Sequence, residues 1–236
     1  AGLAAGGKRV IAVSPASFLT TRALEQIKHD ICYSDRPVVL VGISAGVSYG
    51  ALGSTHHSLH DFAALRAINN VIVAAPADNW EAEEAVAAAV LQQTPVYLRF
   101  GKKPLPHLPH PESFSFGKGR IIRDGSDGFF VATGETVWRA LEAAETLYES
   151  QLSVGVISMH TVKPLDVELL CSVARRSRFV VTVEEHSEHG GLGDACACVL
   201  LENGIAPRFR RIGIPDEETI TGSQEQQYPG ILGRVP

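Results

Sequence analysis

The sequence lacks long apolar runs and long blocks of one charge. No stretch reaches the roughly 20 apolar residues that a membrane-spanning helix needs, and no charged-then-apolar leader opens the chain. The net charge of -5 comes from 21 Lys and Arg mixed with 26 Asp and Glu, which favours neither nucleic acid nor an anionic membrane as a partner. We therefore expect a soluble cytoplasmic protein without membrane or nucleic-acid partners.

Cysteine is also scarce. The four cysteines are Cys32, Cys171, Cys196 and Cys198, and no pair has the Cys-x-x-Cys spacing of a zinc or redox site. His56 and His60 have the i, i+4 spacing of a helical zinc pair, but the glutamate of such a motif is absent between them. The sequence thus predicts a reducing compartment and assigns no residue to a metal site.

What the sequence does contain is a regular alternation of apolar β-branched runs and helical periodicity. Runs typical of buried strands occupy residues 9–13, 37–41, 71–75, 95–100, 128–132, 154–158 and 179–184. Helical patterns lie between them, and the βαβ order is that of parallel sheets. We predict an α/β protein with two doubly wound domains, the second smaller than the first and with a mostly parallel sheet.

A proline-rich stretch separates the two halves. Residues 102–111 contain four prolines, a density that excludes both helix and sheet and predicts an extended linker. The expected domains are residues 1–101 and 117–236, with the linker at 102–116. The first seven residues resemble the last turns of a helix, so the chain is expected to begin inside a domain; residues 214–236 allow no assignment.

Two features of the first half are candidates for chemistry. The loop over residues 50–61 is punctuated by glycine and ends in Ser-Thr-His-His before a helix, which places His56 where α/β sheets expose functional groups. Arg99 ends an apolar strand and could bind a phosphate or carboxylate with its forked guanidinium. A surface ion pair is the alternative for Arg99.

A hydrolase is the rival interpretation from the residues alone. The run Gly42-Ile43-Ser44-Ala45-Gly46 matches the Gly-x-Ser-x-Gly elbow and follows an expected strand. However, further turn-forming residues follow where an elbow passes directly into a helix, and His186 or His189 would have to complete the triad. This interpretation predicts ester hydrolysis that is lost on Ser44→Ala.

The ordered series of motifs resembles the transketolase family over nearly the whole chain. The first half carries Gly53-Ser54-Thr55-His56-His57, Asp61, Ala75-Pro76-Ala77-Asp78 and Pro95-Val96-Tyr97-Leu98-Arg99. The second carries Val162-Lys163-Pro164-Leu165-Asp166, Val181-Thr182-Val183-Glu184-Glu185-His186, Gly190-Gly191-Leu192-Gly193 and Gly213-Ile214-Pro215-Asp216. The first series resembles the pyrimidine-binding domain of that family, incomplete at its N-terminus, and the second its C-terminal domain.

The resemblance implies a cofactor and a partner chain. Family members bind thiamine diphosphate between two chains, with the diphosphate and Mg²⁺ held by a separate domain that carries a Gly-Asp-Gly motif. That motif is absent from this sequence. The implied protein is the C-terminal subunit of a split transketolase, a transferase of carbohydrate metabolism that moves a two-carbon ketol unit when paired with the N-terminal subunit, as an α2β2 heterotetramer with a homodimeric core.

The resemblance also assigns roles to residues. Phe18 matches the aromatic residue that packs on the cofactor pyrimidine, His56 the histidine that hydrogen-bonds the sugar, and Arg99 an arginine that binds the substrate phosphate. Leu52 and Ser44 stand where the family has an aspartate and a histidine that bind substrate hydroxyls, which predicts a modified or less hydroxylated substrate. The activating glutamate is expected upstream of residue 1.

Two alternatives within the resemblance stay open. The β-subunit of a 2-oxo acid dehydrogenase has the same two-domain arrangement, although the Ser-Thr-His-His loop and Arg99 favour transketolase. The other is a non-catalytic assembly subunit, which Leu52, Ser44 and the missing glutamate motivate.

Overall fold

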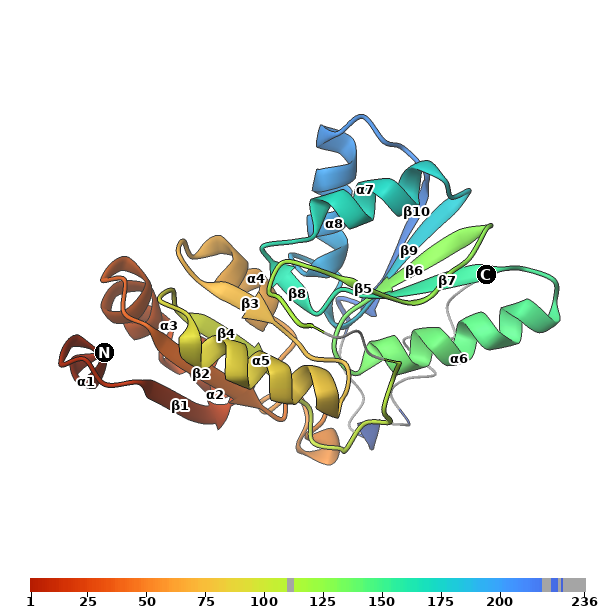
Figure 1. Cartoon of the computed structure of the whole chain (residues 1–236). Coiled ribbons are helices and arrows are strands. Elements are labelled where there is room, and N and C mark those ends of the chain that lie inside the picture. Colours follow the sequence, from red (N-terminus) through yellow and green to blue (C-terminus); the bar gives the residue numbers. More distant parts are fainter. Residues whose placement is uncertain (110–112, 218–221, 225, 227–236) are drawn as a thin grey trace.

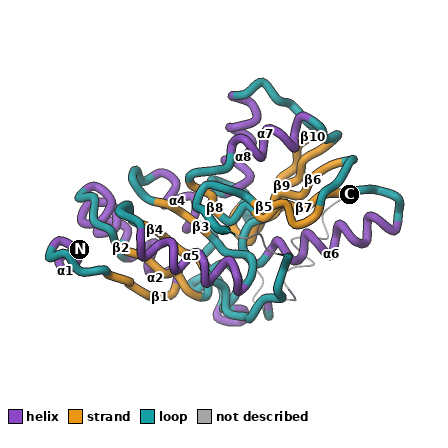
Figure 2. Tube along the Cα trace, viewed as in Figure 1, coloured by secondary structure: helices purple, strands orange, loops and turns teal. Residues whose placement is uncertain are grey.

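The structure contains two five-stranded sheets with helices on both faces of each. It is a computed structural model that describes residues 1–109, 113–217, 222–224 and 226 (Figure 1). In each sheet, four strands run parallel and one edge strand runs antiparallel. The predicted α/β class with two doubly wound, mostly parallel sheets is confirmed (Figure 2).

The first sheet has the order β1-β2-β4-β3-β8. Its strands are β1 (Val10–Pro15), β2 (Val38–Ile43), β4 (Val96–Arg99), β3 (Ile72–Ala74) and β8 (Thr161–Lys163). The helices of this half are α1 (Gly2–Ala5), α2 (Ala16–Arg22), α3 (Leu24–Gln26), the π-helical η1 (Ile27–Tyr33), the short 3-10 turn η2 (Gly50–Leu52), α4 (Asp61–Ala67) and α5 (Asn79–Leu91). Buried residues of α2, η1 and α4 pack on one face of the sheet, and those of α5 pack on the other.

Helix α5 confirms one sequence prediction and corrects another. The predicted N-cap is present, since the Asp78 carboxylate accepts a hydrogen bond from the Glu81 amide at 2.7 Å. The predicted inner face of Val86 and Val90 is wrong, because Ala85 and Ala89 are buried while Val86 is 37% exposed. The helix is apolar nearly all round, so hydrophobicity did not mark the inner face; methyl side chains let it pack close to the sheet.

The second sheet has the order β10-β9-β6-β7-β5. Its strands are β10 (Arg208–Ile214), β9 (Phe179–Ser187), β6 (Gly128–Ala132), β7 (Val154–Ser158) and β5 (Arg120–Arg123). Helix α6 (Thr136–Glu149) covers one face, and α7 (Val167–Arg175) and α8 (Leu192–Glu202) cover the other (Figure 1). The Asp166 side chain caps α7 as predicted, by accepting from the Leu169 amide at 3.0 Å.

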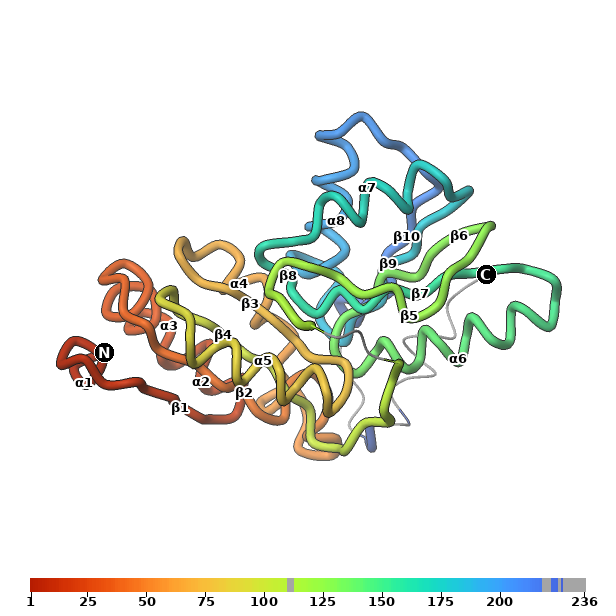
Figure 3. The backbone as a smooth tube through the Cα atoms, in the orientation of Figure 1, coloured from red at the N-terminus to blue at the C-terminus, as the bar shows by residue number. Residues whose placement is uncertain are grey.

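The two halves are interlocked rather than joined only by a linker. Strand β8 comes from the second half of the sequence but pairs with β3 in the first sheet (Figure 3). The Arg120 guanidinium of β5 also forms an ion pair with Glu81 of α5 at 2.7 Å. Sequence analysis missed β5, β8 and β10, and the proposed boundary at 102–116 stays a prediction. In the described part of the chain, no helix is long and apolar enough to cross a membrane.

Candidate active site

The carboxyl ends of three parallel strands in the first sheet bring the candidate site together. Strand β1 passes directly into α2, which places Phe18 in the first turn of that helix. The loop after β2 carries His56, and the chain leaving β4 carries Lys102. Parallel sheets bind ligands at this edge because the loops from neighbouring strands converge there.

The His56 imidazole lies between two aromatic rings. Its ring centroid is 5.2 Å from that of Phe18 and 5.2 Å from that of Tyr49, with both pairs in edge-on geometry. Thr55 Oγ1 lies 2.9 Å from His56 Nδ1. No hydrogen-bond partner of His56 Nε2 is present among the described residues, so that nitrogen is available to a ligand.

The neighbouring His57 has a structural position. It is 3% exposed, and its Nε2 donates to the Gly50 carbonyl at 3.0 Å. Burial lowers the pKa of His57, which favours the neutral imidazole that such a bond requires. Gly46 and Ser58 close the same loop with two backbone hydrogen bonds, of 2.9 and 3.1 Å. The loop that presents His56 is therefore held at its base.

Arg99 is buried at the junction of the two halves. Its Nε donates to Asp61 at 2.8 Å, and its Nη2 donates to the carbonyls of Ser58 and Glu185 at 3.1 and 2.7 Å. Burial would raise the pKa of Asp61, but the Arg99 charge outweighs it and the pKa lies below its usual value. This guanidinium has protein partners in the structure, and its predicted contact with a substrate phosphate stays a prediction.

The exposed cation beside the candidate site is Lys102, which sequence analysis missed. Its Nζ lies 4.3 Å from the centroid of the Tyr49 ring. In the described part of the chain no carboxylate forms an ion pair with it. The signal was its place three residues after Arg99, at the end of the same strand, but the prolines that follow led us to include it in the linker.

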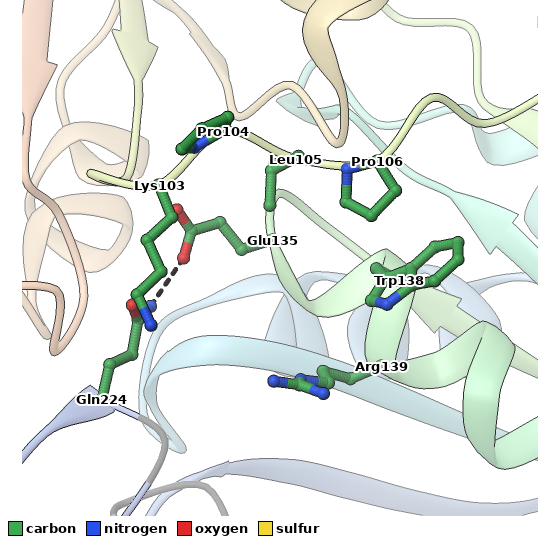
Figure 4. Close-up of a pocket in the computed structure, with 8 residues that line it drawn as sticks. All are labelled: Lys103, Pro104, Leu105, Pro106, Glu135, Trp138, Arg139 and Gln224. Atoms are coloured by element: carbon green, nitrogen blue, oxygen red, sulfur yellow. Dashed lines mark hydrogen bonds between the residues drawn. The ribbon is translucent and has the colours of Figure 1, made fainter.

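The second half contributes buried acids that hold this loop from behind. Glu185 Oε1 accepts from the Val47 amide at 2.7 Å, and the Gln224 amide bridges Glu135 and Glu185 at 2.6 and 3.0 Å. Burial, and secondarily the Glu185 charge, raise the pKa of Glu135 to about 7. Figure 4 shows Glu135 and Gln224 at the edge of a cavity of about 200 Å³.

The close approach of these acids requires a glycine in the loop. Gly46 has a φ of +61°, and a Cβ there would lie 2.0 Å from Glu185 Oε1. Glu184, the next residue on β9, instead accepts from the amides of Leu192 and Gly193 at the start of α8. The expectation that the two glutamates point to opposite faces of the strand is thus confirmed.

The structure does not assemble the hydrolase alternative. Ser44 is 3% exposed with a φ of +54°, and no histidine hydrogen-bonds to it in the described part of the chain. His186 is fully buried, with Nδ1 2.8 Å from the Ser187 carbonyl and its ring stacked on Phe62. His189 is exposed, and β2 leads into the turn η2 rather than into a helix.

The histidine pair considered for zinc is also separated by its contacts. Helix α4 begins at Asp61, so neither His56 nor His60 is helical. His60 Nε2 lies 3.5 Å from Thr20 Oγ1, whereas His56 contacts Thr55. Within the described ranges, no cluster of three or more His, Cys, Asp or Glu side chains could hold a metal ion.

Comparison with known proteins identifies the family. The model described as "Transketolase, pyrimidine binding domain" matches residues 1–107, and that described as "Transketolase, C-terminal domain" matches residues 117–232. The chain belongs to the transketolase family. Its members are thiamine diphosphate-dependent transferases, and the predicted resemblance is confirmed.

Individual relatives agree with this assignment. One of the two kinds of chain of apulose-4-phosphate transketolase from Phocaeicola vulgatus is 41% identical over 97% of this chain and 73% of the relative. The protein of the same name from Actinobacillus succinogenes is 38% identical over 92% of this chain and 70% of its own length. A solved structure described as a split gene transketolase, inactive beta4 tetramer, is 34% identical with a TM-score of 0.87, covering 98% of this chain and 74% of that one.

The residues at the sheet edge fit a transketolase cofactor pocket. Phe18 is half-buried, which leaves part of its ring accessible for stacking on a flat heteroaromatic ring. The structure brings Phe18 and His56 into contact, as the predicted pocket requires. Leu52 is 56% exposed in η2 and Ser44 is buried at the end of β2; the substrate-binding roles of these four residues and of Arg99 stay predictions.

Proposed function

We propose that this chain forms one wall of a transketolase active site and transfers a two-carbon ketol unit from a ketose phosphate. The observation that carries the proposal is the His56 imidazole, held between Phe18 and Tyr49 with its Nε2 available and the Lys102 ammonium nearby. When bound, thiamine diphosphate supplies the electron sink that ketol transfer requires. The chain's own residues bind and orient the sugar.

Each side chain has a distinct task in this proposal. Phe18 stacks on the pyrimidine ring and, with Tyr49, keeps water from the imidazole. His56 Nε2 hydrogen-bonds a hydroxyl oxygen of the sugar, and the Thr55 hydroxyl at Nδ1 fixes the orientation of the ring. Lys102 binds the phosphate, because its charge is exposed while that of Arg99 is buried against Asp61.

The proposal includes a second chain. The sequence carries no Gly-Asp-Gly motif for the diphosphate and Mg²⁺, and the names of two relatives describe each of them as one subunit of a transketolase. We infer that an N-terminal transketolase subunit supplies those groups and that the two chains form an α2β2 assembly with a homodimeric core, in the cytoplasm. The chain alone is then expected to be inactive.

The substrate pocket is less polar than its family pattern implies. An exposed leucine at position 52 cannot hydrogen-bond a hydroxyl, and Ser44 is short and buried. A ketose phosphate with fewer or displaced hydroxyl groups is therefore the proposed donor. Apulose 4-phosphate, which gives two of the relatives their name, is the first donor to test.

The test is ketol transfer by the full-length chain, alone and with its proposed partner, in the presence of thiamine diphosphate and Mg²⁺. We expect turnover only with the partner, and a loss of about 100-fold or more in His56→Ala, because a positioned acid–base group contributes about 10²–10⁴-fold. His189→Ala, an exposed histidine of the second half, is the matched control. Full turnover in His56→Ala, or none with any ketose phosphate, contradicts the proposal.

A further inference from the structure

Tyr49 contacts the two groups of the site that carry opposite tasks. Its ring meets the His56 imidazole edge-on at 5.2 Å, and the same ring lies under the Lys102 ammonium at 4.3 Å. One side chain thus links the loop after β2 to the chain leaving β4. His56 and Lys102 would otherwise be joined only through the backbone of two separate loops.

The contact matters because the lysine has little else to hold it. Lys102 is exposed, has four rotatable carbons and forms no ion pair with the carboxylates of the described chain. A cation within about 6 Å of an aromatic centroid is attracted to the ring face while its remaining surface stays open. A carboxylate in the place of Tyr49 would instead compete with an incoming phosphate.

The tyrosine itself is well supported. It precedes η2, and its carbonyl accepts from the Leu52 amide at 3.3 Å. The following residue, Gly50, receives the hydrogen bond from the buried His57. The aromatic ring is therefore anchored by the base of the same loop that presents His56.

We propose that Tyr49 is a positioning residue that fixes the Lys102 ammonium at a set separation from the His56 imidazole and so selects phosphorylated ketoses by the distance between phosphate and reacting hydroxyl. This inference rests on the proposed function. It assigns the tyrosine no contact with the reacting atoms. Its effect is to pre-organise a flexible cation, which lowers the ordering cost of binding the phosphate.

The experiment compares Tyr49→Leu, Tyr49→Phe, Lys102→Met and the Leu/Met double variant in the assembled enzyme. Tyr49→Leu is expected to raise KM for a ketose phosphate by about 3- to 30-fold, the range of a cation–π contact. Its kcat should change less than its KM, and its KM for an unphosphorylated ketose should stay within about 2-fold, since only the phosphate site is disturbed. Tyr49→Phe should behave as the parent, and Tyr49→Leu should add nothing to Lys102→Met.

A second measurement does not depend on turnover. Titration of inorganic phosphate into the full chain with its partner should show weaker binding in Tyr49→Leu and Lys102→Met, but not in Tyr49→Phe. Phosphate binding in this order without ketol transfer would refute the proposed function and leave the role of Tyr49 supported. Equal KM increases for phosphorylated and unphosphorylated ketoses, or full additivity of the two substitutions, would overturn the role of Tyr49.

Discussion

The two sheets end their parallel strands in different ways. At the carboxyl edge of the first sheet, Phe18, Tyr49 and His56 are half-buried and Lys102 is exposed. At the corresponding edge of the second sheet, Glu184, Glu185 and His186 are all buried and all hydrogen-bonded to protein. Both edges carry histidines and glycine-rich turns, but only one leaves its polar atoms available to a ligand.

The difference separates binding from support. Burial lowers the pKa of His186 to about 4 and raises that of Glu184 to about 7, so both residues favour their neutral forms. Perturbed values of this kind are often taken as a sign of an active site. Here they mark the surface on which the second half grips the catalytic loop, and the candidate site is the edge where polar groups stay accessible.

The largest expected effect comes from breaking the contact between the two edges. Arg99→Met removes the guanidinium that joins Asp61 to the Glu185 carbonyl and leaves the Asp61 carboxylate buried without its counter-charge. Loss of one partner of a buried pair costs about 3–5 kcal/mol in the free energy of unfolding. Urea denaturation of the purified chain measures it.

The control for Arg99 is an exposed pair in the second half. Arg178 is 74% exposed and lies 3.3 Å from Asp127, so Arg178→Met should change stability by less than about 1 kcal/mol. The double variant Arg99→Met with Asp61→Asn should recover part of the loss, because no buried charge remains. Equal stabilities of the Arg99 and Arg178 variants would show that Arg99 does not hold the halves together.

This arginine also shows where sequence reasoning ends. The strand β4 and the position of Arg99 at its end were predictable, because they depend on local apolar pattern and on the polarity of parallel strands. The partners of the guanidinium come from the opposite half of the chain and from Asp61, 38 residues away. No local pattern indicates which charged side chain will be buried by such distant contacts.

The candidate site was predictable to the same depth. His56 and Phe18 were found from motifs, whereas Tyr49 and Lys102 were not, because their importance lies in a contact between two loops. The strand β8 was missed for a related reason. It is three residues long and pairs with a sheet built mainly from the other half, so its stability comes from tertiary pairing rather than from its own sequence.

A substitution of intermediate effect sharpens the contrast through pH. The pKa of Glu135 rises from 4.5 to about 7 in the folded chain, so between these values the native state retains a proton that the unfolded state has released. The contribution of Glu135 to stability therefore falls as the pH rises through this window. Glu135→Gln stays neutral, and we expect it to be more stable than the parent at pH 8 by about 1–3 kcal/mol, with a smaller difference near pH 5.

Thermal unfolding across that pH range provides the measurement. Glu142→Gln, on the same helix but with a side chain that is 46% exposed, is the matched control and should give a difference that does not grow with pH. If Glu135→Gln and Glu142→Gln followed the same pH dependence, the Glu135 carboxylate would not be a cost borne by the domain contact.

The smallest expected effect tests the open edge itself. Thr55→Val removes the hydroxyl beside His56 Nδ1 and leaves the imidazole free to rotate and to change tautomer. Because one hydrogen bond is worth about 0.5–1.5 kcal/mol, kcat for ketol transfer by the assembled enzyme should fall about 2- to 10-fold. Thr55 is exposed, so the stability of the chain should not change. Thr55→Ser keeps the hydroxyl and should retain most of the activity; a serine variant as slow as the valine variant would mean that the hydroxyl does not orient His56.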